Sequence, residues 1–542
     1  MPALSLPCFN ESEVSLATLT YYGIGGTARF LAHPSTPREL AELLLWNRDH
    51  NLPLALMGQG SNILFSDAAF PGIVITLDRM KRLFWLSDDD LFCEGGADNT
   101  LIANELLKRS RGGGEWLYRL PGQIGSTVRM NARCFGGEIS NITKGIITLS
   151  IGGQLRWLTP DEVFHGYKHT SLMDNPEIVV AVILHFPLTR SQQEINTLMQ
   201  GYNDERSKKH HFDFPSCGST FKNNYTSGRS SGSIFEELGF KGQHEGGAMV
   251  SDYHANFIFN KGGATAYDVL SLCAKMRTAA LKKASVQLDL EVECIGLFES
   301  KLLAPCGVRH VADSNDSSRG WAGLFWNPQN KPDKKDIPEL KFPQVLLQGP
   351  FVGYRGIDRE IPSGTFVEVQ QLISLKDAIA DPDSTFLRWT TRSSCNSPLF
   401  SIQPPSIHPA GSFTDGLWQY GVSELFIADG DDVNSGYLEF ELTPARHWLA
   451  LRFTDPRKRA ESSDIPSPEP WVEDVRIVGD KECFGMEFSY KLLQPFINKE
   501  TIALQCCVSS GRGEYGLFPW WAPSSAPADF HQPAQYFRIR LL

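Results

Sequence analysis

The chain has 542 residues, more than one hydrophobic core usually organises, so at least two domains are expected. Its formal net charge of -11 argues against a general affinity for nucleic acid or for an anionic membrane surface. No apolar stretch approaches the roughly 20 residues that span a bilayer, and the 11 cysteines show neither metal-ligand spacing nor the pattern of a secreted disulfide framework. We therefore expect a cytoplasmic protein with reduced thiols, no metal site and no membrane insertion.

The first 300 or so residues alternate segments typical of strands with segments typical of helices. Apolar residues recur with helical spacing over Glu39–His50 and Tyr267–Lys283, and apolar runs at Gly72–Leu77 and Val286–Leu297 predict strands. This alternation indicates an α+β or α/β fold.

After Leu303 the pattern changes to short alternating strands separated by segments rich in turn residues. We expect strands at Glu424–Ile427, Tyr437–Leu442 and Trp448–Phe453. Their spacing predicts an antiparallel β-sandwich, and the polar segment from Ala304 to Lys335 is expected to hold the junction between domains.

A glycine loop follows the strand-like run that begins at Leu54, with the sequence Gly58-Gln59-Gly60-Ser61-Asn62. Small residues there let backbone amides approach a pyrophosphate closely, and Ser61 and Asn62 can donate hydrogen bonds from their side chains. An ordinary structural turn has a similar composition, so this loop alone leaves both interpretations open.

A second glycine cluster runs from Leu120 to Thr127, and it is followed by Met130–Ala132 and Phe135–Ile139. Two separate loops of this kind in one domain can hold both ends of a dinucleotide. The alternative is a pair of structural turns.

Together with Tyr21–Gly26, these loops resemble the UDP-N-acetylenolpyruvoylglucosamine reductases, whose FAD domain is similar to the vanillyl-alcohol-oxidase type. Matching segments follow in the same order over roughly residues 18–298, and the short run from Asn223 to Gly232 is similar to the shorter-looped branch of that family. The matching segments are Pro215–Asn223, Leu238–Gly242, Val250–Ile258 and Leu290–Gly296.

This resemblance implies that NADPH reduces bound FAD and that the reduced flavin then reduces UDP-N-acetylglucosamine enolpyruvate to UDP-N-acetylmuramate, a precursor of peptidoglycan. The flavin would supply the redox chemistry, and the protein would orient the substrate and stabilise its enolate-like intermediate. The residues that the resemblance assigns to FAD are Gly58, Gln59, Gly60, Ser61, Asn62, Pro121, Gly122, Gly125, Ser126, Asn131, Gly136 and Ile139.

The same resemblance implies that Ser219 donates the proton and that Glu291 lies near the enolpyruvyl carboxylate. The family has an arginine where this chain has Lys168, which keeps the positive charge but loses the planar fork of a guanidinium. Arg133 stands in an altered flavin loop, and we hypothesise that it supplies the missing guanidinium. The residues assigned to substrate binding are Tyr167, Arg206, Lys209, Lys222, Asn223 and His244.

Residues 417–429 and 436–444 resemble DOMON-like sandwiches related to family-nine carbohydrate-binding modules, which implies a sugar ligand or a protein partner for this region. We expect three domains, which are an FAD-binding domain (1–192), an α+β substrate-binding domain (193–302) and the sandwich (303–542). A related FAD oxidoreductase with another substrate, and a non-catalytic scaffold that binds flavin or nucleotide sugar, are the alternatives.

Overall fold

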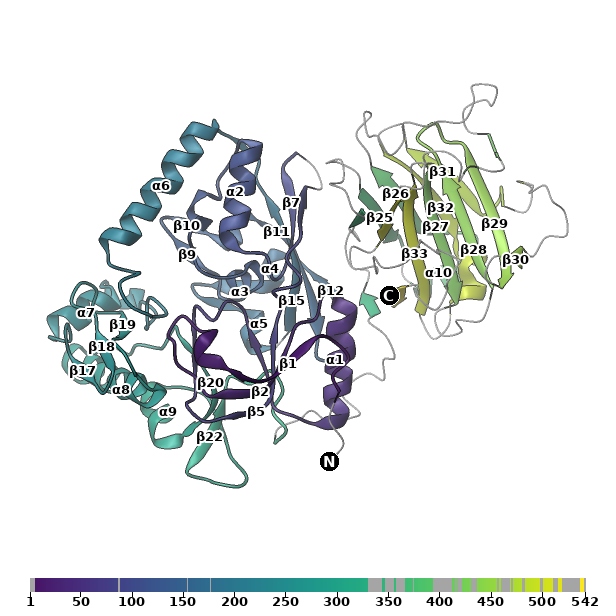
Figure 1. Ribbon diagram of the computed structural model, residues 1–542. Helices are drawn as coiled ribbons and strands as arrows, with labels where there is room; N and C mark the ends of the chain where they lie inside the picture. The colour runs from purple at the N-terminus through teal and green to yellow at the C-terminus, as the bar shows by residue number, and fades with distance from the viewer. Residues whose placement is uncertain are drawn as a thin grey trace.

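The computed structural model describes residues 5–85, 88–153, 155–175 and 177–329, and, in the rest of the chain, the segments 344–346, 355–356, 366–373, 375–392, 412–414, 417, 422–429, 436–455, 458–459, 468, 471–479, 483–497, 501–509, 515–518 and 537–540. Figure 1 shows the N-terminal elements on the left and the C-terminal strands on the right.

The first sheet has four strands and is accompanied by helix α1 (Pro37–His50). β1 is antiparallel to β2, and both β2 and β3 run parallel to β5. The helix begins where Thr36 accepts a hydrogen bond from the Glu39 amide, and it ends at Asn51, whose φ of 54° is left-handed. The helix and the buried strand expected here are confirmed. The strands are β1 (Asn10–Ser15), β2 (Thr27–Ala32), β3 (Leu54–Met57) and β5 (Phe70–Thr76).

Five further strands, in the order β12-β11-β15-β7-β6, pair antiparallel with one another and form one end of a 14-stranded sheet that continues beyond β12 into the C-terminal strands. Helices α2 (Asn99–Arg109) and α3 (Ile124–Arg129) accompany it. A Cβ atom on Gly125 would lie 2.9 Å from the carbonyl oxygen of Gly95, so the close approach of α3 to the sheet requires glycine there. The strands are β6 (Leu83–Trp85), β7 (Asp90–Glu94), β11 (Thr143–Ser150), β12 (Leu155–Leu158) and β15 (Glu177–His185).

Several short elements connect these strands and carry residues of the site. They are β8 (Arg111–Gly112), β9 (Arg133–Cys134), β10 (Gly137–Glu138), α4 (Pro160–Val163), β13 (Phe164–Gly166), β14 (His169–Thr170), α5 (Ser171–Asp174) and β16 (Leu188–Thr189).

The next part of the chain carries three helices and a three-stranded sheet; the sheet, α7 and α8 form a separate lobe, whereas α6 packs beside α2. The long helices are set by capping boxes, in which Ser191 and Glu194 begin α6 and Thr265 and Asp268 begin α8. Helix α8 confirms the helix expected over Tyr267–Lys283. The elements are α6 (Gln192–Lys208), α7 (Ser231–Glu237), β17 (His244–Glu245), β18 (Ala248–Val250), β19 (Ile258–Asn260) and α8 (Ala266–Ala284).

Strand β20 (Glu293–Glu299) joins the two ends of this N-terminal region, because it pairs in parallel with β4 (Ile63–Phe65). The strand expected over Val286–Leu297 therefore begins later in the chain. Beyond it lie α9 (Ser300–Cys306), β21 (Val311–Ala312) and β22 (Arg319–Ala322), and β22 pairs antiparallel with β20.

Chain segments beyond the expected junction at residue 302 also reach the first sheet. The Trp326 backbone amide and carbonyl both bond to Leu54, and the Trp326 indole donates to Asn51 Oδ1 at 3.1 Å. The segment from Ala304 up to residue 329 is thus packed into the N-terminal region instead of forming an open linker.

The C-terminal strands form two antiparallel groups, and their buried apolar residues belong to one cluster that also includes residues of α1 and of the N-terminal strands. One has the order β25-β26-β32-β31, and the other contains β27, β28, β29 and β33. Strand β28 coincides with the expected Tyr437–Leu442, and β27 and β29 contain the other two expected strands. Helices α10 and α11 lie in the same part of the chain as these strands. Strand β23 pairs in parallel with both β12 and β35. The elements are β23 (Gln344–Leu346), β24 (Arg355–Gly356), β25 (Phe366–Gln371), α10 (Leu375–Ala380), β26 (Thr385–Arg392), β27 (Val422–Asp429), β28 (Tyr437–Leu442), β29 (Trp448–Asp455), β30 (Lys458–Arg459), β31 (Val475–Gly479), β32 (Cys483–Ser489), α11 (Tyr490–Leu493), β33 (Thr501–Ser509), β34 (Tyr515–Phe518) and β35 (Phe537–Arg540).

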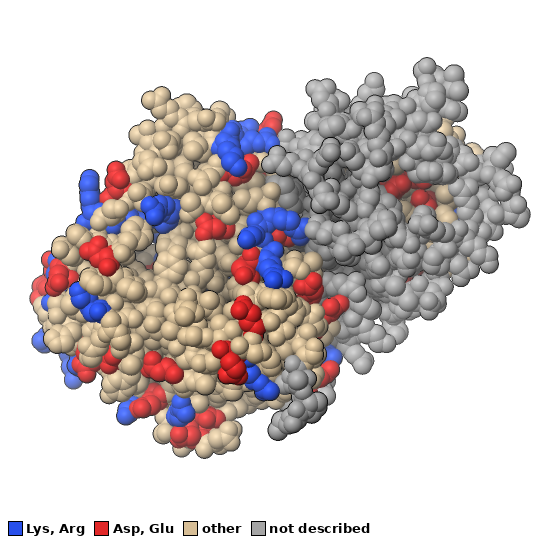
Figure 2. Space-filling model, viewed as in Figure 1, with Lys and Arg blue, Asp and Glu red and all other residues tan. Residues whose placement is uncertain are grey.

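Charged side chains of both signs are interspersed on the face of the N-terminal region that Figure 2 shows. Among the described residues, no helix has the length and apolar character required to cross a membrane.

Candidate functional site

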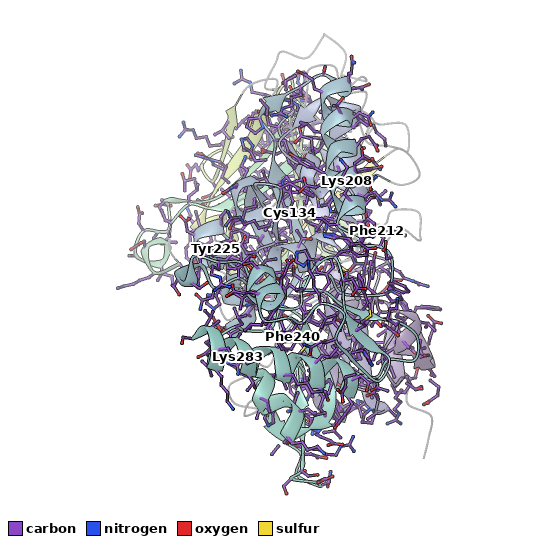
Figure 3. All side chains as sticks on the ribbon, turned by 90° about the vertical axis from the view of Figure 1, so that its left-hand side faces the viewer. Cys134, Lys208, Phe212, Tyr225, Phe240 and Lys283 are labelled. Carbon is purple, nitrogen blue, oxygen red and sulfur yellow. The ribbon has the colours of Figure 1, made fainter. Side chains whose placement is uncertain are left out.

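A cavity of about 870 Å³ lies where the sheets and the separate lobe of the N-terminal region meet. Its volume is in the range of pockets that take cofactors and large small molecules. A second cavity of about 260 Å³ adjoins it, and Cys134 lines both. In Figure 3, Cys134 lies between Tyr225, which lines the smaller cavity, and Phe212, which lines the larger one.

The first glycine loop forms one wall of the larger cavity, since all five of its residues, 58–62, line it. Gly60 has a φ of 67°, and a Cβ atom on it would lie 2.5 Å from the carbonyl oxygen of Leu19. The Gly60 carbonyl in turn accepts the Tyr21 amide at 3.0 Å. The backbone therefore passes so close to Leu19 and Thr20, just before the Tyr21–Gly26 segment, that only glycine fits.

The second glycine loop faces the first one and is bonded to it. Gln59 Oε1 accepts the Gly122 amide at 2.9 Å, and the Ser61 hydroxyl donates to the Pro121 carbonyl at 3.3 Å. A Cβ atom on Gly58 would meet Ser126 Oγ at 3.2 Å. The two loops predicted from separate parts of the sequence thus form one small-residue cradle.

Three residues assigned to FAD from the sequence are not among the lining residues of either cavity, and they support the loops instead. Asn131 is 2% exposed and donates to Glu138 Oε1 and to the Gly166 carbonyl, both at 2.9 Å. Ile139 is fully buried, and the Gly122 amide is used by Gln59. Those that line the larger cavity are Gly58, Gln59, Gly60, Ser61, Asn62, Pro121, Gly125 and Ser126, while Gly136 lines the smaller one.

The smaller cavity brings together the four residues to which the sequence assigns catalysis. Ser219, Glu291, Lys168 and Arg133 all line it, although they come from parts of the chain that are far apart. Of the two cationic residues, Arg133 is more exposed than Lys168. Its Nε lies 4.0 Å from Glu138 Oε2.

Ser219 begins a short extended segment that is held on both sides. It forms a β-bridge with Phe257, and two residues later Phe221 forms a bridge with Leu290. The Glu291 amide donates to the Thr220 carbonyl at 2.8 Å. The hydroxyl of Ser219 and the carboxylate of Glu291 are therefore carried by adjacent backbone segments.

Glu291 is the acidic residue among those that line the smaller cavity. Its carboxylate accepts a hydrogen bond from Lys168 Nζ at 2.6 Å, and its carbonyl accepts one from Asn62 Nδ2 at 2.9 Å. The Asn62 contact ties the first glycine loop to the segment that carries the carboxylate.

Lys222 does not line either cavity, because its ammonium group is used within the protein. Lys222 Nζ donates to the Lys168 carbonyl at 3.0 Å. Lys168 has a left-handed φ of 51°, and this bond stabilises the backbone in that conformation. Lys222 thus supports Lys168 in this structure, and the substrate role expected for Lys222 stays a prediction.

Arg206 lines the larger cavity, but its guanidinium already bonds to the protein. It is 4% exposed and donates to the Tyr118 carbonyl at 2.7 Å and to the Trp116 carbonyl at 3.2 Å. Lys209 also lines the cavity and donates to Glu205 at 2.6 Å. Of these two residues, Lys209 is half-exposed, and its ammonium group can turn towards a ligand.

Tyr167 and Asn223, two further residues assigned to the substrate, line the smaller cavity. The Tyr167 ring packs edge-on against Tyr225 with centroids 4.8 Å apart, and burial together with the nearby Glu291 raises the pKa of the Tyr167 phenol. Tyr167 is therefore a neutral hydrogen-bonding group. His244 is exposed on β17 and lines neither cavity, so the structure does not bring it to this site.

Sequence reasoning missed several residues that line the cavities. Arg129, at the end of α3, forms an ion pair with Glu293, and both line the larger cavity. Glu293 stands in the segment Leu290–Gly296 that the resemblance had identified, whereas Arg129 stands in none of the matching segments. His211 lines the same cavity, and burial with nearby His254 lowers the pKa of His211 to about 4. Asn256 lines the smaller cavity within a segment that the resemblance had identified.

Comparisons with known proteins match the same part of the chain. A family model for an FAD binding domain matches residues 28–154, and one for the C-terminal domain of UDP-N-acetylenolpyruvoylglucosamine reductase matches residues 210–295. The chain is 32% identical over 294 residues to the UDP-N-acetylenolpyruvoylglucosamine reductase of Synechococcus sp. (strain JA-3-3Ab), which covers 54% of this chain and 94% of the relative.

A second curated relative and a solved structure are also similar to this chain. The corresponding reductase of Clostridium botulinum (strain Hall) is 33% identical over 278 residues, which is 51% of this chain and 89% of the relative. The crystal structure of UDP-N-acetylenolpyruvylglucosamine reductase from Thermus caldophilus is 30% identical, covers 53% of this chain and 99% of its own, and has a TM-score of 0.45.

Proposed function

The chain belongs to the UDP-N-acetylenolpyruvoylglucosamine reductases, and from this premise we propose which of its residues act when it reduces UDP-N-acetylglucosamine enolpyruvate to UDP-N-acetylmuramate with FAD and NADPH. The observation that carries the proposal is the meeting of Ser219, Glu291, Lys168 and Arg133 around one cavity that adjoins the glycine cradle.

The glycine cradle fits a dinucleotide. Gly58 and Gly60 leave no room for side chains, and their loop faces the second glycine loop across the larger cavity. Backbone amides are the neutral donors that a pyrophosphate accepts. The hydroxyls of Ser61 and Ser126, which donate to the Pro121 and Gln123 carbonyls in this structure, would turn from them to reach a ligand. FAD, when bound there, supplies the transfer of two electrons from NADPH to the carbon–carbon double bond of the substrate.

Ser219 is the proton donor to the substrate carbon next to the carboxylate. A serine hydroxyl is a weak acid, so the accepting carbon must carry enolate character and the serine oxygen must be near positive charge. Lys168 and Arg133 line the same cavity and provide that charge, which also stabilises the enolate of the substrate. Glu291 orients Lys168 through their hydrogen bond.

The absorption spectrum of the purified chain tests the activity and the role of Ser219 together. The flavin should bleach with NADPH and recover on addition of the enolpyruvyl sugar nucleotide. In Ser219→Ala the flavin should bleach at the normal rate, but its recovery should be slower by several orders of magnitude. Equal slowing of both stages, or no slowing of the second, would remove Ser219 from this role.

We further propose that the reductase unit extends to about residue 329 and that the C-terminal strands form an appended β-sandwich. Pairing of β22 with β20 supports the longer reductase unit. Two antiparallel strand groups with a common apolar core support the sandwich. The ligand proposed for the sandwich is a sugar or a protein surface. Co-purification of the isolated residues 330–542 with a sugar or with a protein tests this proposal.

A further inference from the structure

Asn256 is a buried polar residue next to the Ser219 segment. It is 3% exposed, and it lines the smaller cavity together with Ser219 and Glu291. A buried side-chain amide has two donors and an acceptor that need partners, so its bonds determine its conformation.

The side chain of Asn256 satisfies both backbone groups of one residue. Asn256 Oδ1 accepts the Phe221 amide at 3.0 Å, and Asn256 Nδ2 donates to the Phe221 carbonyl at 2.9 Å. The Asn256 carbonyl accepts the Thr220 amide at 2.8 Å. The carboxamide therefore takes the place that a peptide group of a neighbouring strand would occupy.

The opposite edge of the same segment is bonded to the segment that carries Glu291. The Thr220 carbonyl accepts the Glu291 amide, and the Lys222 amide donates to the Asp289 carbonyl at 2.9 Å. Asn256 on one side and residues 289–291 on the other thus hold the Ser219 segment between them. Loss of the Asn256 side chain would leave the Phe221 amide without its acceptor and free the segment on one side.

We propose that Asn256 is a positioning residue that fixes the Ser219 hydroxyl relative to Glu291 for protonation of the substrate. The inference rests on the proposed role of Ser219 as proton donor. Since a misplacement of about 1 Å can slow a reaction roughly 10²-fold, a clamp of this kind affects the rate of proton transfer without touching the substrate.

Asn256→Asp tests the clamp because it keeps the acceptor and removes the donor. One carboxylate oxygen still accepts the Phe221 amide, but the other faces the Phe221 carbonyl and needs a proton there. A buried aspartate in that position has a raised pKa. We expect flavin reduction by NADPH to stay normal, and reoxidation by substrate to slow about 10²-fold once the pH is high enough to ionise the carboxyl. The rate should recover as pH falls and the carboxyl becomes a donor.

Asn47→Asp is the matched control, because Asn47 makes the same pair of bonds far from the site. It is 1% exposed, accepts the Leu52 amide at 3.3 Å and donates to the Leu52 carbonyl at 3.0 Å. It should lower stability while leaving both stages at their normal rates.

The inference would be overturned by normal reoxidation in Asn256→Asp up to about pH 9, the upper range for a buried carboxyl, by equal slowing of both stages, or by slowing that does not recover at lower pH. If the aspartate variant loses flavin, Asn256→Ser provides the second measurement, and normal reoxidation in it has the same meaning. Ser219→Ala separates the two proposals. Normal reoxidation in Ser219→Ala removes the proposed role of Ser219. Slow reoxidation in Ser219→Ala together with normal reoxidation in Asn256→Asp removes only the positioning role of Asn256.

Discussion

Lys168 Nζ donates to Glu291 Oε1 at 2.6 Å, and the two side chains are only 11% and 14% exposed. The pair occupies a wall of the smaller cavity, where partial burial makes the loss of either partner costly. A lysine acts as a point charge, so its position depends on the groups that hold it. Glu291 holds the ammonium group, and Lys222 holds the Lys168 backbone.

Removal of this cation should affect the second stage of the reaction. We expect Lys168→Ala to slow flavin reoxidation by substrate about 10²- to 10³-fold, the usual loss of one charge-stabilising donor, and to leave flavin reduction by NADPH unchanged. Lys168→Arg should reoxidise at least as fast as the wild type. Stopped-flow absorbance measures both stages, with Lys144→Ala at an exposed ion pair as the control. A fully active Lys168→Ala would contradict the proposal.

Arg133 is expected to share this work, because it lines the same cavity as Lys168. Arg133→Ala should slow reoxidation, and the double variant with Lys168→Ala should lose much less than the sum of the two single losses in activation free energy. The same half-reaction measurement on the four proteins of the cycle tests this. Full activity of Arg133→Ala would rule out compensation between the two cations.

Local patterns predicted the helices, the two glycine loops and the C-terminal strands, because each depends on residues that are close in the sequence. Thr36 and the apolar spacing after it specify α1, and Gly60 specifies a loop that no larger residue could form. The Ser219 and Glu291 assignments came from the resemblance, and the structure brings the two residues to one cavity.

The roles of buried polar groups could not be predicted, because they depend on partners that only the fold brings close. Arg206 was assigned to substrate binding from the sequence, yet its guanidinium donates to two carbonyls that lie 88 and 90 positions earlier in the chain. Lys222 and Asn256 likewise form hydrogen bonds with backbone groups that are far from them in the sequence. Sequence pattern also could not show that residues after 302 return to the first sheet.

His211 should make stability depend on pH. Its folded pKa of about 4 lies below the ordinary value of about 6.5, so between these values the unfolded chain binds more protons than the folded one. The free energy of unfolding should therefore fall as pH drops from about 6.5 towards 4, and no further loss arises from this group at lower pH. His211→Gln should show a shallower decline in urea unfolding measured at pH 7, 6 and 5. An identical decline in both proteins would contradict the assignment.

The position of the domain boundary can be tested with two truncated chains, one ending at Ser300 and one ending at Gln329. The shorter chain lacks β22 and Trp326, so it exposes the edge of β20 and leaves the Leu54 backbone and Asn51 without their partners. It also lacks Leu324 and Phe325, which line the larger cavity. We expect the chain ending at Gln329 to be yellow and to reduce the enolpyruvyl substrate at close to the full-length rate, and the chain ending at Ser300 to lose flavin or precipitate. Flavin content by absorbance and steady-state oxidation of NADPH measure both. A fully active shorter chain would place the boundary near residue 302, and an inactive longer chain would mean that the C-terminal strands complete the reductase.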